Sequence, residues 1–164
     1  SFRLYSLYQK GSSLRKILFL ALFCTFLFGE NLKTDPFFKD VNTTCPIKFI
    51  DVFNHPDFIA VLVYANGEKI LFSSVKPMFH YFHMNPGKHI SPLKTMLVTD
   101  FKTHALIDAA TAYYVFGSGI MSNSGDDLIP FANLDDAKEF MSANHGHKIL
   151  EFKDVTKKLI DYLN

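Results

Sequence analysis

A chain of 164 residues can form one ordinary domain, or two very small ones that share a core. Hydrophobic residues make up 48% of it, which makes a packed core feasible and excludes wholesale disorder. The 17 basic and 16 acidic residues give a formal net charge of +1, and this near balance argues against a nucleic-acid-binding protein, in which basic residues are in clear excess.

Residues 1–29 have the pattern of an export signal. Arg15 and Lys16 precede an apolar run over 17–28, and the small residue Gly29 follows it. This order is typical of a secretory signal peptide, and the run is shorter than the roughly 20 apolar residues of a transmembrane helix. An uncleaved N-terminal anchor is the rival interpretation. Lipoprotein attachment at Cys24 is disfavoured, because a bulky residue precedes this cysteine.

The beginning of the chain carries a second expectation. No methionine precedes Met78, and the signal-like pattern begins at Leu14. We expect Leu14 to be the translation start, decoded from a non-standard initiation codon, with residues 1–13 as upstream read-through. A fragment that has lost its true beginning is the alternative. In either case the fold begins after about Glu30, and the polar segment 30–44 is expected to be a linker.

From Cys45 onward the pattern predicts a first ββαβ unit over 45–101. Its expected elements are strands over 58–64 and 68–72, a helix over 74–84 and a strand over 95–101. The first two strands are joined by an Asn-Gly turn, which is typical of a hairpin. The helix is indicated by apolar residues at i, i+3, i+4 and i+7 and by a proline in its first turn.

A second ββαβ unit with a C-terminal tail is predicted over 102–164. Its expected elements are strands over 112–116 and 127–131, a helix over 133–143, a strand over 148–152 and a short helix or tail over 155–163. Pro130 predicts an edge position for the second of these strands, because proline cannot donate a ladder hydrogen bond. Asn133 is expected to cap the helix.

The two units align with each other. Phe72 and Phe131 fall at equivalent strand ends, and Phe82 and Met141 at equivalent helix positions. Units this short are marginally stable alone, so the halves are expected to pack against each other. The sequence therefore predicts an α+β fold made of two similar ββαβ units.

Several segments also carry a family likeness. In the second half they are IDAATAYYVFGS over 107–118, GDDLIPF over 125–131, DDAKEF over 135–140 and HGHKILEF over 145–152. In the first half they are CPI at 45–47, FIA at 58–60, VKPMF at 75–79 and VTD at 98–100. Between Cys45 and Val155 the chain resembles the NosL family. The resemblance implies a periplasmic accessory protein that binds Cu(I) and helps to supply the copper centres of nitrous oxide reductase. It also implies a fold of two ββαβ units.

The chain departs from the family at its metal positions. Where the family commonly opens with a CxxCGM-like motif, Cys45 is kept, but Lys, Phe and Ile occupy 48–50 in place of Cys, Gly and Met. The resemblance implies a thioether ligand from a GPMG-like loop, and Ser124 stands in the place of that methionine. Met121, three residues earlier, could substitute for it.

Cu(I) prefers thiolate and thioether ligands and accepts imidazole. After signal removal Cys45 is the single thiol, which excludes an intramolecular disulfide and leaves a metal ligand, an intermolecular bridge or a buried inert thiol. With the resemblance, we predict a partly open Cu(I) site with Cys45 as thiolate anchor and Met121 as thioether partner. One histidine completes the site, with His55 and His104 both open. Lys48 is expected to favour the thiolate.

A second constellation lies on the first helix. His80, His83 and Met84 fall at i, i+3 and i+4 and could converge on one ion, although a polar helix face that happens to contain histidines explains them as well. His145 and His147 resemble the helix-ending turn of the family, which favours a cap followed by a surface histidine.

The motifs of common enzyme classes are missing from the sequence. It contains no glycine-rich phosphate loop, nucleophile elbow or zinc-protease helix. The NosL fold has been likened to that of organomercurial lyases, but their chemistry needs paired cysteines. We therefore expect no enzyme. The expected partner is nitrous oxide reductase or another copper protein, with a transient membrane association and no nucleic acid. The alternative is a copper-free periplasmic module of the NosL fold that binds a protein.

Overall fold

The computed structural model of the protein describes residues 32–84 and 91–164. The chain divides into two compact units, Ser1–Lys39 and Asp40–Asn164. The predicted signal peptide and the proposed start at Leu14 lie outside the described residues. None of the described helices combines the length and the apolar character that a bilayer span requires.

The described part of the first unit consists of two short 3₁₀ turns, Leu32–Thr34 and Pro36–Phe38. Asp35 caps the second turn by accepting a hydrogen bond of 2.7 Å from the Phe37 backbone N–H. Proline at the first position of the turn suits this cap, because its missing N–H would have had no partner there.

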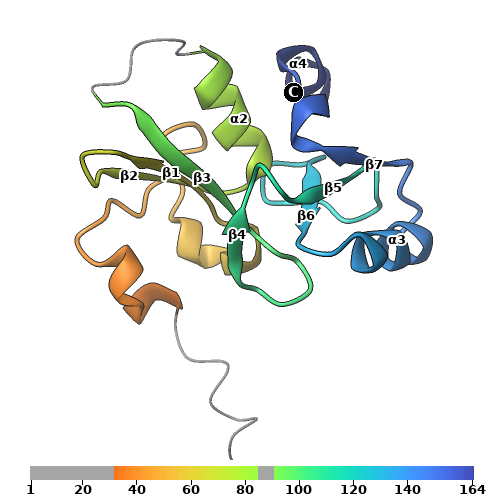
Figure 1. The fold of residues 1–164 in the computed structure, drawn as a ribbon, viewed down its shortest axis with the longest axis horizontal. Coiled ribbons are helices and arrows are strands. Elements are labelled where there is room, and N and C mark those ends of the chain that lie inside the picture. Colours follow the sequence, from red (N-terminus) through yellow and green to blue (C-terminus); the bar gives the residue numbers. More distant parts are fainter. Residues whose placement is uncertain (1–31, 85–90) are drawn as a thin grey trace, which may run out of the picture. The chain divides into compact units, whose positions relative to one another are not determined.

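The second unit begins with an antiparallel sheet in the order β2-β1-β3-β4 (Figure 1). Its elements are β1 (Ala60–Tyr64), β2 (Lys69–Phe72), α2 (Val75–Met84), β3 (Leu93–Thr99) and β4 (Leu106–Asp108). The hairpin turn between β1 and β2 contains Gly67, whose φ of +89° favours glycine. The strand β4 pairs with β3, so this segment of the predicted second half extends the first sheet.

The second sheet is antiparallel in the order β6-β5-β7. Its half contains β5 (Tyr113–Phe116), β6 (Leu128–Phe131), α3 (Leu134–Ala143) and β7 (Lys148–Glu151), and α4 (Lys157–Leu163) follows. Pro130 lies in the edge strand β6, as predicted. The Asn133 side chain accepts a hydrogen bond of 2.7 Å from the Asp135 N–H, which confirms the predicted helix cap.

The halves share one topology, with the first strand of each at the centre of its sheet and the helix between the second and third strands. Phe72 and Phe131 end β2 and β6, and both are buried. Phe82 and Met141 lie at the same distance from the starts of α2 and α3, and both are partly buried. The predicted α+β fold of two similar ββαβ units is confirmed.

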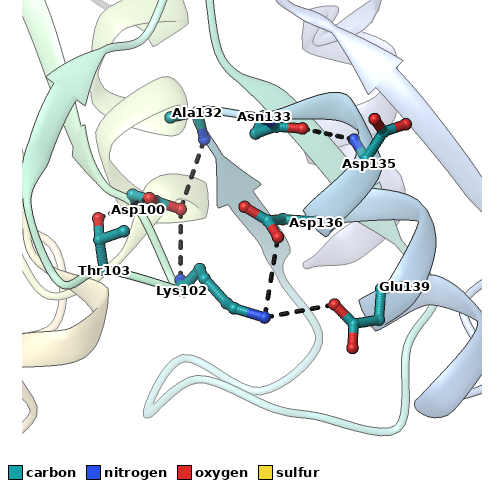
Figure 2. Close-up of polar contacts among 8 residues, drawn as sticks. All are labelled: Asp100, Lys102, Thr103, Ala132, Asn133, Asp135, Asp136 and Glu139. Carbon is teal, nitrogen blue, oxygen red and sulfur yellow. Dashed lines mark hydrogen bonds and ion pairs between the residues drawn. The ribbon is translucent and has the colours of Figure 1, made fainter.

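The halves are joined where β3 ends (Figure 2). Asp100 is buried, and its Oδ1 accepts hydrogen bonds from the Ala132 N–H at 3.4 Å and the Lys102 N–H at 3.3 Å. Phe101 stacks edge-on against Phe131 and Phe140, the latter on α3. An apolar contact and a buried carboxylate therefore link the first sheet to the second half.

The helix α2 also belongs to both halves. It packs against β1 and β2 of its own half, against β6 of the other, and against α4, which lies beside it in Figure 1. Its first five residues, 75–79, are all buried, whereas α3 buries only Ala137 completely. The start of α2 is therefore an interior position, and the candidate site lies there.

Candidate metal site around Cys45

Cys45 opens a tight backbone turn ahead of the first sheet. Its N–H donates to the Ile50 carbonyl at 2.9 Å, and the Phe49 N–H donates to the Cys45 carbonyl at 2.8 Å. An isolated bridge between Thr44 and Asp51 closes the turn. The result is that Cys45 is 0% exposed, whereas Phe49 is 80% exposed at a φ of +57°.

The Cys45 thiol faces a cluster of serine hydroxyls. Ser73 donates to Cys45 Sγ at 3.5 Å, and its Oγ lies 3.4 Å from that of Ser124. Ser74 donates to the same Ser124 Oγ at 3.0 Å. Ser73 and Ser74 fill the junction between β2 and α2, and Ser124 comes from the loop between β5 and β6. The thiol is thus linked through Ser73 to a hydroxyl from the other half.

Next to the serines, Asp127 supplies the missing cap of α2. Its Oδ1 accepts hydrogen bonds from the backbone N–H groups of Lys76 at 2.9 Å and Leu128 at 2.8 Å, and its Oδ2 accepts one from Ser122 at 2.7 Å. Burial raises the pKa of this carboxyl, and the hydrogen bonds oppose the shift. The acceptor at a helix start is usually local, but here it comes from the other half of the fold.

Lys76 is a second buried charge at this position. It is 4% exposed, and its Nζ donates to the Leu163 carbonyl of α4 at 2.9 Å. Burial lowers the pKa of Lys76, and the charge of Asp127 opposes this effect. The C-terminal helix is thereby held to the helix whose start borders the candidate site.

The structure brings only part of the predicted site together. Hydrogen bonds through Ser73 connect Cys45 to Ser124 of the loop that contains Met121. The Met121 side chain is 63% exposed, and its pairing with Cys45 stays a prediction. The expectation of a partly open thiol is wrong for this structure, because Cys45 is fully buried.

The histidines are held in separate contacts. His83 Nε2 lies 3.2 Å from the Val155 carbonyl oxygen, and His80 Nδ1 lies 3.3 Å from Asn164 Nδ2. His104 Nδ1 pairs with Asp57 at 2.9 Å. Over residues 32–84 and 91–164, no group of three His, Cys, Asp or Glu side chains forms a metal cluster. The third ligand of the predicted site therefore stays open between His55 and His104.

The helix-ending turn is as the sequence led us to expect. The Asn144 N–H donates to the Phe140 carbonyl at 2.9 Å at the end of α3. His145 follows with a φ of +58°, and His147 is exposed. A residue in the left-handed region directly after a helix is a common C-terminal cap.

These residues match a known family. A model described as NosL matches residues 38–160. The chain belongs to the NosL family. The copper-binding lipoprotein NosL of Stutzerimonas stutzeri is 38% identical over 55 residues, an alignment that covers 34% of this chain and only 28% of that protein. The crystal structure of the copper chaperone NosL from Shewanella denitrificans superposes with a TM-score of 0.61 at 20% identity, covering 72% of this chain and 94% of that one. The latter likeness concerns the NosL fold alone.

Sequence reasoning missed Ser73, Ser74 and Asp127 as neighbours of the NosL-type loop. Ser73 and Ser74 directly precede α2 and are favoured local caps, so the sequence indicated a cap within this half and not one from Asp127. Chemically, the hydroxyls are hard donors that suit Cu(I) poorly, so Cys45 is the soft group in this cluster of contacts.

Proposed function

We propose that this NosL-family protein is an exported copper(I)-binding accessory protein, acting in the periplasm as a carrier or assembly factor for the copper centres of nitrous oxide reductase. Cys45 is the thiolate anchor and Met121 the thioether partner, and one histidine completes a site of low coordination number. The protein performs no catalysis of its own in this proposal, and copper is its cargo.

One observation carries the proposal. Hydrogen bonds through Ser73 link the Cys45 thiol to Ser124, the loop position that the family resemblance assigns to a thioether donor. Cys45 and Ser124, which are distant in the sequence, are thus joined through one residue in the fold. Met121 is in the same loop, and its exposed side chain is available to an incoming ion. Two similar proteins, one named a copper-binding lipoprotein and the other a copper chaperone, support the same choice of ion.

A second candidate function is favoured by a different observation. The thiol is fully buried, and a hydroxyl occupies the position of the family's soft donor. Both features fit a protein that has kept the NosL fold without its copper and binds a protein partner in the periplasm. This candidate predicts no Cu(I) affinity beyond that of exposed methionines and histidines.

A Cu(I) titration tests the proposal. The protein, as isolated from the exporting cell, competes with a chromophoric Cu(I) chelator under anaerobic, reducing conditions. We expect Cys45→Ala to lower the affinity on the order of 100-fold, because it removes the single anionic ligand. Met121→Leu should lower the affinity less, by about tenfold, because a neutral thioether is lost.

Met84→Leu is the matched control for Met121→Leu. Met84 is also an exposed methionine, at 58%, but it lies on α2 in the His80–His83 constellation. Unchanged affinity in this variant supports the Cys45 site. A loss in Met84→Leu together with full affinity in Cys45→Ala would move the copper to the helix. A wild-type protein that does not compete with the chelator would favour the copper-free module.

A further inference from the structure

The loop segment 121–125 is fastened at its base. The Ser122 N–H donates to the Gly125 carbonyl and the Gly125 N–H to the Ser122 carbonyl, each at 3.0 Å. The Ser122 hydroxyl donates to Asp127 at 2.7 Å and accepts from the Ser124 N–H at 2.9 Å. Because Asp127 also caps α2, this base is anchored to the core of the unit.

The same segment is fastened a second time at Ser124. Its hydroxyl takes part in the contacts with Ser73 and Ser74, and Ser73 in turn donates to the Cys45 sulfur. Ser124 therefore links the loop, through Ser73, to the thiol. Cys45 is 0% exposed with these bonds in place.

Between the two fastened serines lies an unsatisfied side chain. Among the residues that the structure describes, Asn123 has a buried amide nitrogen and a buried amide oxygen that find no hydrogen-bond partner. Unpaired buried polar groups are unusual and unfavourable, and water would satisfy both atoms if the segment moved outward. The closed arrangement is therefore less stable than its serine bonds alone would make it.

We propose that residues 121–125 form a latch, held by Ser122 and Ser124, that shuts Cys45 off from solvent and opens locally to expose it. In the closed state a lone thiol in an oxidising compartment is protected from disulfide formation with other molecules. In the open state Cys45 becomes reachable on the side of the loop that carries Met121. The use of the latch for copper entry rests on the proposed function, but the latch itself concerns only access to the thiol.

Thiol labelling measures the opening directly. The full chain reacts under native conditions with Ellman's reagent, and modification is followed by mass spectrometry at the peptide that contains Cys45. Local opening limits this reaction, because the closed thiol is inaccessible. Ser124→Ala should accelerate labelling on the order of tenfold, because it removes the hydroxyl contacts that hold the closed state.

Ser118→Ala is the matched control. Ser118 is in the same loop, but its hydroxyl donates to the Ile120 carbonyl at 3.3 Å and takes no part in the latch. Its labelling rate should stay within about twofold of the wild-type rate. Asn123→Leu tests for the opposite effect, a slower labelling rate. It replaces the unsatisfied amide with an apolar side chain of the same branched shape, and should slow labelling by about threefold or more because the closed state gains stability.

Denaturant separates local opening from global unfolding. A latch exposes little surface, so the labelling rate should depend only weakly on urea, whereas global unfolding depends on it steeply. Labelling that follows global unfolding in the wild type, or that is equally fast in Ser124→Ala and Ser118→Ala, would overturn the latch. Neither result bears on copper affinity, and a failed Cu(I) titration leaves the labelling test unchanged.

Discussion

The two ββαβ halves share a topology but begin their helices in different ways. The second half is locally complete: α3 is capped by Asn133 two residues before the N–H that it binds, and the helix lies largely at the surface. The first half is not locally complete in this way. The start of α2 is buried, and its acceptor is Asp127 from the other half.

This difference distinguishes the half that holds the candidate site from the other half. A self-capped helix is stable by local means, whereas a helix capped from a distant loop ties that loop to its own first turn. In this protein the tied loop is the one that carries Ser124 and Met121, and the first turn follows the serines beside Cys45. The half with the borrowed cap therefore contains the candidate site.

The largest expected effect is the loss of the borrowed cap. Asp127→Ala leaves the Lys76 and Leu128 N–H groups and the Ser122 hydroxyl without their buried acceptor. We expect the free energy of unfolding to fall by about 3 kcal/mol in urea denaturation. Asn133→Ala is the matched change in the other half and should cost about 1 kcal/mol. Equal losses in free energy of unfolding would show that the cap from the other half stabilises the fold no more than the local cap does.

A pH series isolates the carboxyl of Asp127. Because its pKa is raised by burial, the folded carboxyl keeps a proton in a range where the unfolded carboxyl, with an ordinary value of 3.8, has lost it. The folded state then binds more protons, so the free energy of unfolding decreases as pH rises from 3.8 through the raised pKa. Subtracting an Asp127→Asn series from the wild-type series should reveal this decline. A flat difference, or one that increases with pH, would contradict it.

The turn at Cys45 should tolerate, and even gain from, a smaller residue. Phe49 holds a φ of +57°, which is strained for a bulky side chain and natural for glycine. Phe49→Gly should raise the free energy of unfolding by about 0.5–1 kcal/mol. His145→Gly, at a φ of +58° after α3, is the counterpart in the second half and should have the same sign. If Phe49→Gly instead lowers the free energy of unfolding, the contacts of the Phe49 ring stabilise the fold by more than the backbone strain destabilises it.

The smallest effect is expected at the exposed link between the halves (Figure 2). Lys102 Nζ lies 3.3 Å from Glu139 and 3.7 Å from Asp136, but its side chain is 52% exposed. Water and salt screen such pairs, so Lys102→Met should leave the urea midpoint unchanged within error. A clear shift that disappears in high salt would show that this surface link holds the halves together.

Local chemistry explains what the sequence could predict. The cap at Asn133, the edge strand with Pro130 and the helix face of α2 follow from neighbouring residues. The bond from Lys76 to Asp127 joins residues 51 positions apart, and no periodicity reveals it. The expected openness of Cys45 failed because its complete burial is set by the tertiary fold and not by neighbouring residues. Likewise, β4 was assigned to the second half but pairs with β3 of the first sheet, and such strand pairing is decided by the tertiary fold.

The central claim is that Cu(I) binds between Cys45 and the loop that carries Met121 and position 124, and one gain-of-function measurement tests it. Ser124→Met places a thioether at the position that hydrogen bonds link to the thiol. Its Cu(I) affinity should rise by about tenfold or more over that of the wild type in chelator competition. Ser118→Met in the same loop should have no such effect. Equal Cu(I) affinity in Ser124→Met, Ser118→Met and the wild type would contradict the assignment of the site.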